Sequence, residues 1–171
     1  MIHHVLYEEF YHLSVKKKLQ TMRALLQRVK QASVTVEEEV KSSIGKGLLI
    51  FIGIENEDGQ EDIEWLTRKI LNMRIFDDEN GDMNKSVMDV DGEMLVISQF
   101  TLHARVKKGN RPSYIDAAKP DVSVPLYEQF VNQLEKESGK KIGIGEFGAM
   151  MDVGLINDGP VTIWMDSKRK E

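Results

Sequence analysis

Several short segments of this chain show the hydrophobic patterns of strands. Val34 and Val36 alternate with polar neighbours, which is the period of a half-buried strand, and residues 22–29 form a plausible partner before them. Leu48 to Ile52 is apolar at every position, as expected of a strand that is covered on both faces. The pattern therefore predicts two opening strands followed by a central one.

Two further segments indicate helices. In the first, apolar residues recur at the spacing of one helix face: Ile63, Leu66, Ile70 and Met73. In the second, Ser123 and Pro125 are typical of a helix start and Gly139 is typical of a helix end. We expect both helices to cover the sheet.

The remaining apolar stretches predict four more strands, at residues 94–102, 142–147, 151–156 and 161–165. Asn157 to Pro160, between the last two, is a turn signature and predicts an ordinary hairpin with a trans proline. No internal repeat or linker interrupts the pattern. The expected fold is a single mixed α/β domain with one mixed sheet of about seven strands and two main helices.

Composition narrows the class of protein. The chain has 171 residues, of which 41% are hydrophobic and 30% charged, which suits one globular domain and argues against a disordered chain. Its longest apolar run, Leu48 to Ile54, is too short to span a bilayer, so we expect no membrane association. The chain contains no cysteine, which removes disulfides, thiolate metal sites and cysteine nucleophiles and favours a cytoplasmic location.

The first 21 residues differ in character from the rest. Met22 opens the first predicted strand, so we interpret residues 1–21 as an upstream extension or a cloning remnant and residues 22–171 as the domain. The alternative, a metal site in this segment, would use three histidines: His3, His4 and His12. Their spacing matches no known metal motif, and we expect neither a metal nor a cofactor in the domain.

A glycine motif and a lone histidine have ordinary explanations. Gly143 to Gly148 satisfies G-x-G-x-x-G, but a helix precedes it and strands follow, so we expect close backbone approach or a bent strand instead of a nucleotide site. His103 is the only histidine after residue 21. On a strand, the period of two would put it beside Gln99 and Thr101. The alternative is an edge-strand histidine without a catalytic role.

The net charge of −5 means that contact with a nucleic acid requires a local basic patch. Four cations lie close together on a segment that also contains Gly109 and Asn110: Arg105, Lys107, Lys108 and Arg111. We expect this loop either to bind phosphate groups, such as those of tRNA, or simply to be solvated.

Two motifs carry a family resemblance. Ser-Gln-Phe-Thr-Leu at residues 98–102 and Asn-Asp-Gly-Pro-Val-Thr at residues 157–162 resemble the signature motifs of the D-aminoacyl-tRNA deacylase family. The resemblance extends from Met22, through Arg-Pro-Ser at residues 111–113, to about Trp164. It implies a deacylase-type fold and a homodimer with its active sites at the interface. The implied activity is hydrolysis of the ester in D-aminoacyl-tRNA, and in glycyl-tRNA mischarged on tRNA-Ala.

The resemblance also implies roles for individual residues. The catalytic segment would be Gln99, Phe100 and Thr101, with backbone amides near Phe100 and Thr101 binding the oxyanion. The substrate-binding residues would be Arg28, Ser98, Phe147, Asn157, Gly159 and Pro160. In the family the glycine–proline bond is cis, enters the partner's pocket and holds the substrate amino group through its carbonyls. Met150 stands where the family often carries Asp or His, which argues against a catalytic role there.

The identity of the attacking group remains open between the Thr101 hydroxyl and water assisted by the ribose 2′-hydroxyl of the tRNA. The scarcity of general bases in the domain favours the ribose. Two other functions compete with the deacylase. One is a nucleic-acid-binding module without catalysis, which would use the basic loop at residues 105–111. The other is a hydrolase or deaminase of small molecules on a similar scaffold.

Overall fold

The computed structural model describes residues 21–170. The predicted extension and its histidines at positions 3, 4 and 12 lie outside the described residues, apart from Thr21, which is buried. The chain contains these elements: β1 (Arg23–Val36), β2 (Glu39–Ile44), β3 (Gly47–Gly53), α2 (Gln60–Asn72), β4 (Phe76–Asp77), β5 (Met83–Lys85), β6 (Glu93–Ser98), the 3₁₀ helix η1 (Phe100–His103), α3 (Pro120–Ser138), β7 (Gly143–Ile144) and β8 (Asp152–Asp166).

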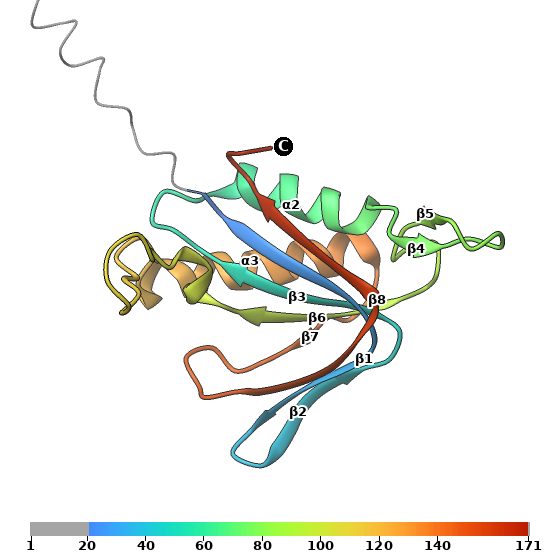
Figure 1. Cartoon of the computed structure of the whole chain (residues 1–171), viewed down its shortest axis with the longest axis horizontal. Helices are drawn as coiled ribbons and strands as arrows, with labels where there is room; N and C mark the ends of the chain where they lie inside the picture. Colours follow the sequence, from blue (N-terminus) through green and yellow to red (C-terminus); the bar gives the residue numbers. More distant parts are fainter. Residues whose placement is uncertain (1–20, 171) are drawn as a thin grey trace, which may run out of the picture.

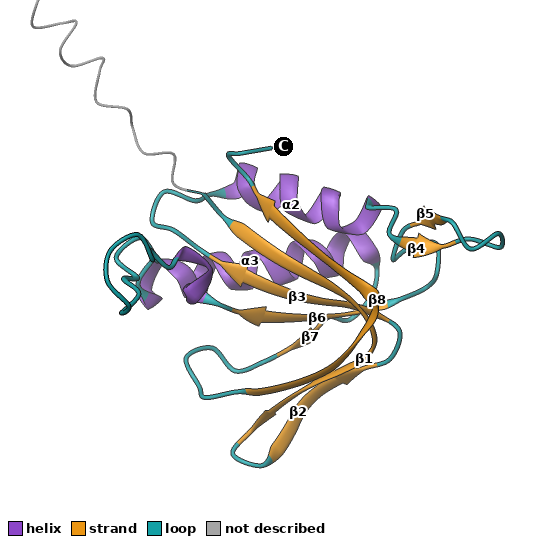
Figure 2. Cartoon of the chain, viewed as in Figure 1, coloured by secondary structure: helices purple, strands orange, loops and turns teal. Residues whose placement is uncertain are grey.

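One mixed sheet organises the domain (Figures 1 and 2). Its strands follow the order β2-β1-β3-β6-β7, with β8 pairing along the other edge of β1, while β4 and β5 form a separate small hairpin. The predicted mixed α/β fold with two main helices is confirmed, and so is the central position of β3, which pairs antiparallel with β1 and parallel with β6. Neither described helix is long and apolar enough to cross a bilayer.

The expected pair of opening strands is instead one strand, β1. Its partners on β8 advance by one residue, from Asn157 to Ile156, while β1 advances by two, from Val29 to Gln31. The extra residue is Lys30, which is exposed. This bulge reverses the inward and outward alternation, so both halves of β1 bury apolar side chains although they face opposite sides of the sheet.

The predicted tail hairpin is also wrong, because β8 is a single strand of 15 residues that pairs with β1 on both sides of the turn signature. Gln27 faces Thr162 whereas Val29 faces Asn157. Residues 158–161 of β8 therefore do not pair with β1 and form a wide excursion from the sheet. Pairing with β1 before and after the excursion outweighs the local turn preference. The strand predicted at residues 142–147 is reduced to the two residues of β7.

Two boundaries differ from those predicted. The strand expected to run to Leu102 ends at Ser98, where the chain turns into η1. Consequently Gln99, Thr101 and His103 do not share one strand face. The second helix begins at Pro120 instead of Ser123, because a proline at the first helical position loses no intrahelical hydrogen bond there. It ends as expected at Gly139, whose φ of 67° is left-handed.

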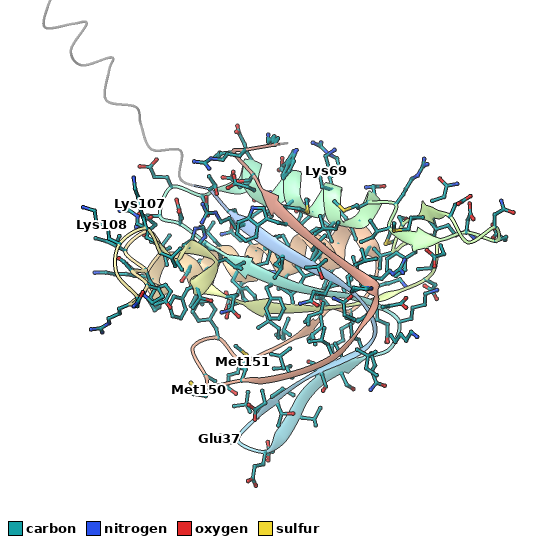
Figure 3. The ribbon with its side chains drawn as sticks, viewed as in Figure 1. Glu37, Lys69, Lys107, Lys108, Met150 and Met151 are labelled. Carbon is teal, nitrogen blue, oxygen red and sulfur yellow. The ribbon has the colours of Figure 1, made fainter. Side chains whose placement is uncertain are left out.

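The two faces of the sheet bury separate apolar clusters. One cluster lies where the far halves of β1 and β8 curl over β3 and β6, with members Val29, Ala32, Val34, Ile44, Leu49, Leu95 and Ile97. Met151 packs against it, whereas its neighbour Met150 is 92% exposed on the outside of the loop (Figure 3). Gly145 lies in the same region, and a Cβ there would come within 2.5 Å of the Met151 sulfur. A side chain at position 145 would therefore clash with the Met151 side chain.

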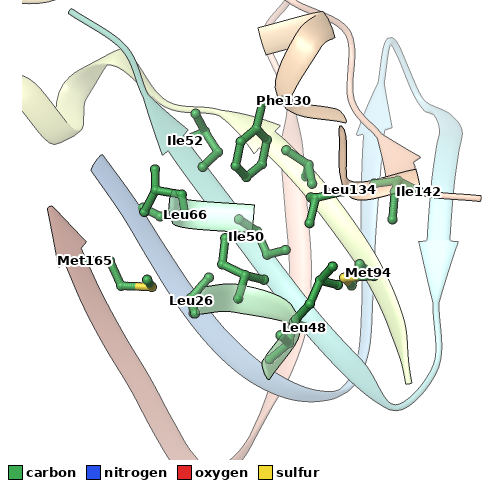
Figure 4. Packing of buried hydrophobic residues seen from close by; sticks show 14 of the residues in the cluster. Leu26, Leu48, Ile50, Ile52, Leu66, Met94, Phe130, Leu134, Ile142 and Met165 are labelled. Carbon is green, nitrogen blue, oxygen red and sulfur yellow. The ribbon is translucent and has the colours of Figure 1, made fainter. Parts of the chain in front are cut away.

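The other cluster lies between the sheet and the two helices (Figure 4). Leu26 of β1, Ile50 of β3 and Leu66 of α2 are fully buried in it, together with Phe130 of α3. Burial of each such side chain contributes about 1.5–3 kcal/mol to stability. This packing fixes the ends of β3 and β6. The motif at residues 98–102 begins at the end of β6.

The parallel pairing of β3 with β6 depends on Gly47. A Cβ there would lie 1.9 Å from the carbonyl oxygen of Glu93. We expect Gly47→Ala to reduce the free energy of unfolding by about 1–3 kcal/mol or more, because backbone must move to admit the methyl group. Urea unfolding measures the change. Gly59→Ala is the matched control, since a Cβ at Gly59 would meet nothing within 4 Å; equal stability of the two variants would contradict the prediction.

Candidate active site

The segment after β6 forms a turn that exposes backbone amides. The Gln99 N–H donates to the carbonyl of Ile52 at 2.7 Å, which ties the turn to the end of β3. The Gln99 side-chain amide donates to the Thr101 hydroxyl. Phe100 and Thr101 are the first two residues of η1, and the first amides of a helix have no acceptor within it. These amides are therefore available to stabilise a developing negative charge.

A small apolar cavity of about 220 Å³ lies beside this turn. Four of the predicted site residues line it: Ser98, Gln99, Phe100 and Phe147. Its other walls come from the end of β3, the start of α3 and the loops beside them, at Ile52, Ile54, Ala118, Pro120, Ser123 and Gly148. Larger hollows of about 740 Å³ lie elsewhere on the surface, but no predicted site residue lines them. The small cavity is thus the one that the motif borders.

Two aromatic pairs hold the sides of the cavity. Phe147 packs edge-on against Tyr127 with ring centroids 5.8 Å apart, and the Tyr127 hydroxyl donates to the Val96 carbonyl at 2.8 Å. Burial raises the pKa of Tyr127, which keeps the phenol protonated. Phe100 packs edge-on against Tyr114 at 5.0 Å and is itself 56% exposed. An aromatic-sided cavity of this kind suits a flat ring such as a nucleobase.

The second motif forms the excursion of β8. The Gly159–Pro160 peptide bond is cis, contrary to the trans bond that the residues alone favoured and in agreement with the family resemblance. Asn157 spans the base of the excursion: its side-chain amide donates to the Gln27 side chain at 2.8 Å, and its side-chain oxygen accepts from the Val161 N–H at 3.0 Å. Gly159 has a φ of 124°, a conformation that L side chains rarely adopt.

Arg28 of β1 anchors the excursion from below. Its buried guanidinium donates to the Asp158 carbonyl at 3.0 Å and to the Ile75 carbonyl at 2.7 Å, and it pairs with the Asp77 carboxylate at 3.1 Å. A Cβ at Gly159 would lie 3.0 Å from the same guanidinium. The excursion is therefore a rigid feature of the chain surface, held by charge-assisted hydrogen bonds.

The two motifs lie at opposite ends of the sheet within one chain. Arg28, beneath the excursion, pairs with Leu48 at the start of β3, whereas Gln99 is bonded to Ile52 near the end of that strand. Four residues of extended chain separate Leu48 from Ile52, which corresponds to about 13 Å. A chain on its own does not bring Gly159 and Pro160 to the cavity.

The predicted basic loop joins η1 to the cavity wall at Ala118. Arg105 pairs with the Asp116 carboxylate, and its backbone bonds to Ser113 across the base of the loop. Lys107, Lys108 and Arg111 are exposed, and Figure 3 shows the two lysines at the outer end of the loop. Three cations thus face solvent near the cavity, while Arg105 holds the loop closed.

His103 lies behind the turn and does not line the cavity. It is 1% exposed, with Nδ1 2.9 Å from Oε1 of Glu55. Burial lowers the pKa of His103, so the ring is neutral at pH 7. Glu55 also accepts the Thr21 N–H at 3.0 Å and bridges to Ala117 of the loop. Sequence reasoning missed Glu55, Tyr114 and Ala118, because these residues follow no motif and meet the site only through tertiary packing.

Comparisons with known proteins identify the family. Residues 25–166 match the profile of the family described as D-Tyr-tRNA(Tyr) deacylase. Two relatives called D-aminoacyl-tRNA deacylase, from Bacteroides thetaiotaomicron and Flavobacterium johnsoniae, are 67% and 66% identical over 150 residues, which is 88% of this chain and 100% of each relative.

Two solved structures have the same fold. A protein named "c-Myc DNA Unwinding Element Binding Protein" superposes with a TM-score of 0.80 at 46% identity, covering 84% of this chain and 97% of that one. A structure described as "Structural Analysis of a probable eukaryotic D-amino acid tRNA deacylase" shares the fold, with a TM-score of 0.74 at 19% identity, over 85% of this chain and 99% of the other. The protein is a hydrolase of the deacylase fold. The chain belongs to the D-aminoacyl-tRNA deacylase family.

A buried carboxylate next to Glu55 makes folding depend on pH. Burial raises the pKa of Asp58 to about 7, and its Oδ1 has no hydrogen-bond partner among the described residues. An unfolded Asp titrates near 4, so the folded chain holds one more proton between about pH 4 and 7 and loses stability as the pH rises through that range.

We expect Asp58→Asn to be more stable than the wild type at pH 8 by about 1–3 kcal/mol, and this difference to shrink toward pH 5. Urea unfolding at the two pH values measures it. Asp152→Asn, which removes an exposed carboxylate of β8, is the control and should show no such trend. A difference for Asp58→Asn that grows on acidification would contradict the prediction.

Proposed function

We propose that the protein hydrolyses the ester of D-aminoacyl-tRNA, and of glycyl-tRNA mischarged on tRNA-Ala, at sites that two protomers build together. The observation that carries this proposal is the separation of the two motifs. The cavity and the catalytic turn lie at one end of β3, and the anchored Gly159–Pro160 excursion lies at the other. A second copy of the chain would unite them.

An open part of the sheet supports the dimer. On the face away from the helices, Leu25 of β1 lies between Trp164 of β8 and Phe51 of β3. Trp164 is 50% exposed, and the other two side chains are partly exposed. Isologous packing of two such faces would bury this apolar row against its own copy. A two-fold axis that crosses β1 at right angles near Leu25 would exchange the ends of this strand, so each excursion would meet the partner's catalytic turn.

The excursion suits a chiral filter. Main-chain carbonyls of Gly159 and Pro160 would accept hydrogen bonds from the substrate α-ammonium, and the rigid backbone would leave no room for an L side chain. Contacts of this kind involve only groups that every amino acid carries. One pocket would therefore accept many D-amino acids and glycine.

The catalytic turn suits ester hydrolysis. The amides of Phe100 and Thr101 would stabilise the oxyanion, and one such donor contributes on the order of 3 kcal/mol to transition-state binding. Gln99 and Ser98 would orient the terminal ribose, with its adenine in the cavity beside Phe147. His103 is the only histidine among the described residues and is buried behind the turn, which favours water activated by the ribose 2′-hydroxyl over attack by Thr101.

The basic loop supports a tRNA substrate in an otherwise acidic protein. Lys107, Lys108 and Arg111 would bind the phosphates of the acceptor stem, while the cavity holds the 3′ end. Charged tRNA is a cytoplasmic substrate, which agrees with the cytoplasmic location that the lack of cysteine favours. Residues 22–171 would form the catalytic domain, because relatives of 150 residues match over their entire length.

A panel of substrates tests the chemistry. We expect purified protein to release tyrosine from D-tyrosyl-tRNA and to leave L-tyrosyl-tRNA intact, measured as the rate of amino acid release. A D-tyrosyl-tRNA that ends in 2′-deoxyadenosine should be cleaved at least about 100-fold more slowly, because it lacks the assisting hydroxyl. Thr101→Ala should keep measurable activity. An inactive Thr101→Ala with normal cleavage of the deoxy substrate would make Thr101 the nucleophile, and binding without any cleavage would favour the non-catalytic module.

Mixed dimers test the shared site. Gly159→Ala distorts the excursion and Gln99→Ala removes a ligand of the ribose, so each homodimer should lose most of its activity. After unfolding and refolding of an equal mixture, random pairing should restore about a quarter of wild-type activity, since half the dimers then contain one intact site. Each variant refolded alone is the control. Activity no higher than that of the separate variants would contradict the shared site.

A further inference from the structure

The catalytic turn is a 3₁₀ helix of four residues, which is too short to hold its orientation by itself. Phe100 on its outer side is 56% exposed, and His103 is the one residue of η1 that is buried. The orientation of the turn therefore depends on what its buried side contacts. The Gln99 N–H donates to the Ile52 carbonyl. The Leu102 carbonyl accepts a hydrogen bond from the Arg23 guanidinium at 2.9 Å.

His103 makes the buried contact. Its Nδ1 lies 2.9 Å from Glu55 Oε1, although neither ring nitrogen has a hydrogen bond of good geometry among the described residues. The ring also lies close to Gly53, where an added Cβ would come within 2.9 Å of Cδ2 and Nε2. Position 53 therefore requires glycine, because the imidazole occupies the space that a side chain would need.

Glu55 connects this contact to the rest of the site. Its other oxygen accepts the Thr21 N–H at 3.0 Å, its own N–H donates to Asp58 at 2.7 Å, and its backbone bridges to Ala117. The next residue of that loop, Ala118, lines the cavity and donates to the Ile54 carbonyl at 2.8 Å. The backbone of Glu55 is therefore fixed at two points, and one oxygen of its carboxylate is fixed by Thr21.

We propose that His103 and Glu55 are positioning residues, whose contact beneath η1 orients the amides of Phe100 and Thr101 toward the substrate carbonyl. This inference rests on the proposed function, because it assigns those amides to the oxyanion. Neither residue touches the substrate. Gln99 and Phe100 are the only members of the turn that line the cavity, and the rest of its wall comes from other parts of the chain, such as Ile52, Pro120 and Phe147.

The proposal separates catalysis from binding. His103→Leu keeps the volume of the ring and removes its nitrogens, so kcat for D-tyrosyl-tRNA should fall by roughly 10- to 100-fold, the effect of a small misplacement of catalytic groups. KM should stay within about twofold, because most of the cavity wall lies outside the turn. His103→Asn puts an amide nitrogen near the place of Nδ1 and should recover most of kcat.

Thr67→Val is the matched control. It removes a buried hydroxyl that donates to the Ile63 carbonyl within α2, away from η1, so it should lower Tm without changing kcat. A loss of kcat in Thr67→Val that follows its loss of Tm would overturn the proposal, since general destabilisation would then account for the effect. So would full activity in His103→Leu, or a His103→Asn enzyme that is folded and no better than His103→Leu.

Gly53→Ala tests the same contact from β3 if His103→Leu does not fold. Its methyl group displaces the imidazole and should lower kcat without raising KM, and an unchanged kcat would overturn the proposal. Absence of cleavage by the wild-type chain would overturn the proposed function and this inference with it. Cleavage by the wild type together with an unaffected His103→Leu would overturn the inference alone.

Discussion

The pairing of β8 with β1 is the constraint on which the rest of the structure depends. The two strands pair from Arg23 opposite Asp166 to Thr35 opposite Asp152, although β8 carries more residues than β1 between those points. The surplus must leave the ladder, and it leaves at Asp158 to Val161. The backbone hydrogen bonds on either side determine where the excursion stands, and Arg28 fills the space beneath it with a buried positive charge.

The fold could be predicted where a pattern of hydrophobic residues had only one solution. The unbroken apolar run at β3 and the helical period of α2 are of this kind. The pattern failed where long-range pairing overruled a local signal. Asn157 to Pro160 favours a hairpin by its own chemistry, but β1 lies beside it and keeps the strand continuous. The bulge at Lys30 could not be predicted either, because an exposed lysine is common in regular strands and does not indicate a bulge.

The candidate site was predictable through its motifs and not through its packing. Ser98, Gln99, Phe100 and Phe147 do meet at one cavity, as the family resemblance implies. The expectation that His103 would share a strand face with Thr101 failed because the chain turns into η1 after Gln99. Nothing near Glu55 in the sequence indicates that it reaches this histidine, because the contact joins residues 48 positions apart across the end of β3.

Because of the bulge at Lys30, the fold depends on the number of residues in β1. Beyond the bulge, Ala32 and Val34 point into one apolar cluster, while before it Ala24 and Leu26 point into the other. Deletion of one residue between them would exchange the buried and exposed faces of half of β1. Apolar side chains of that half would then be lost from their cluster. A deletion or insertion in this segment should therefore be tolerated less well than a substitution, whereas exposed loops should tolerate insertions.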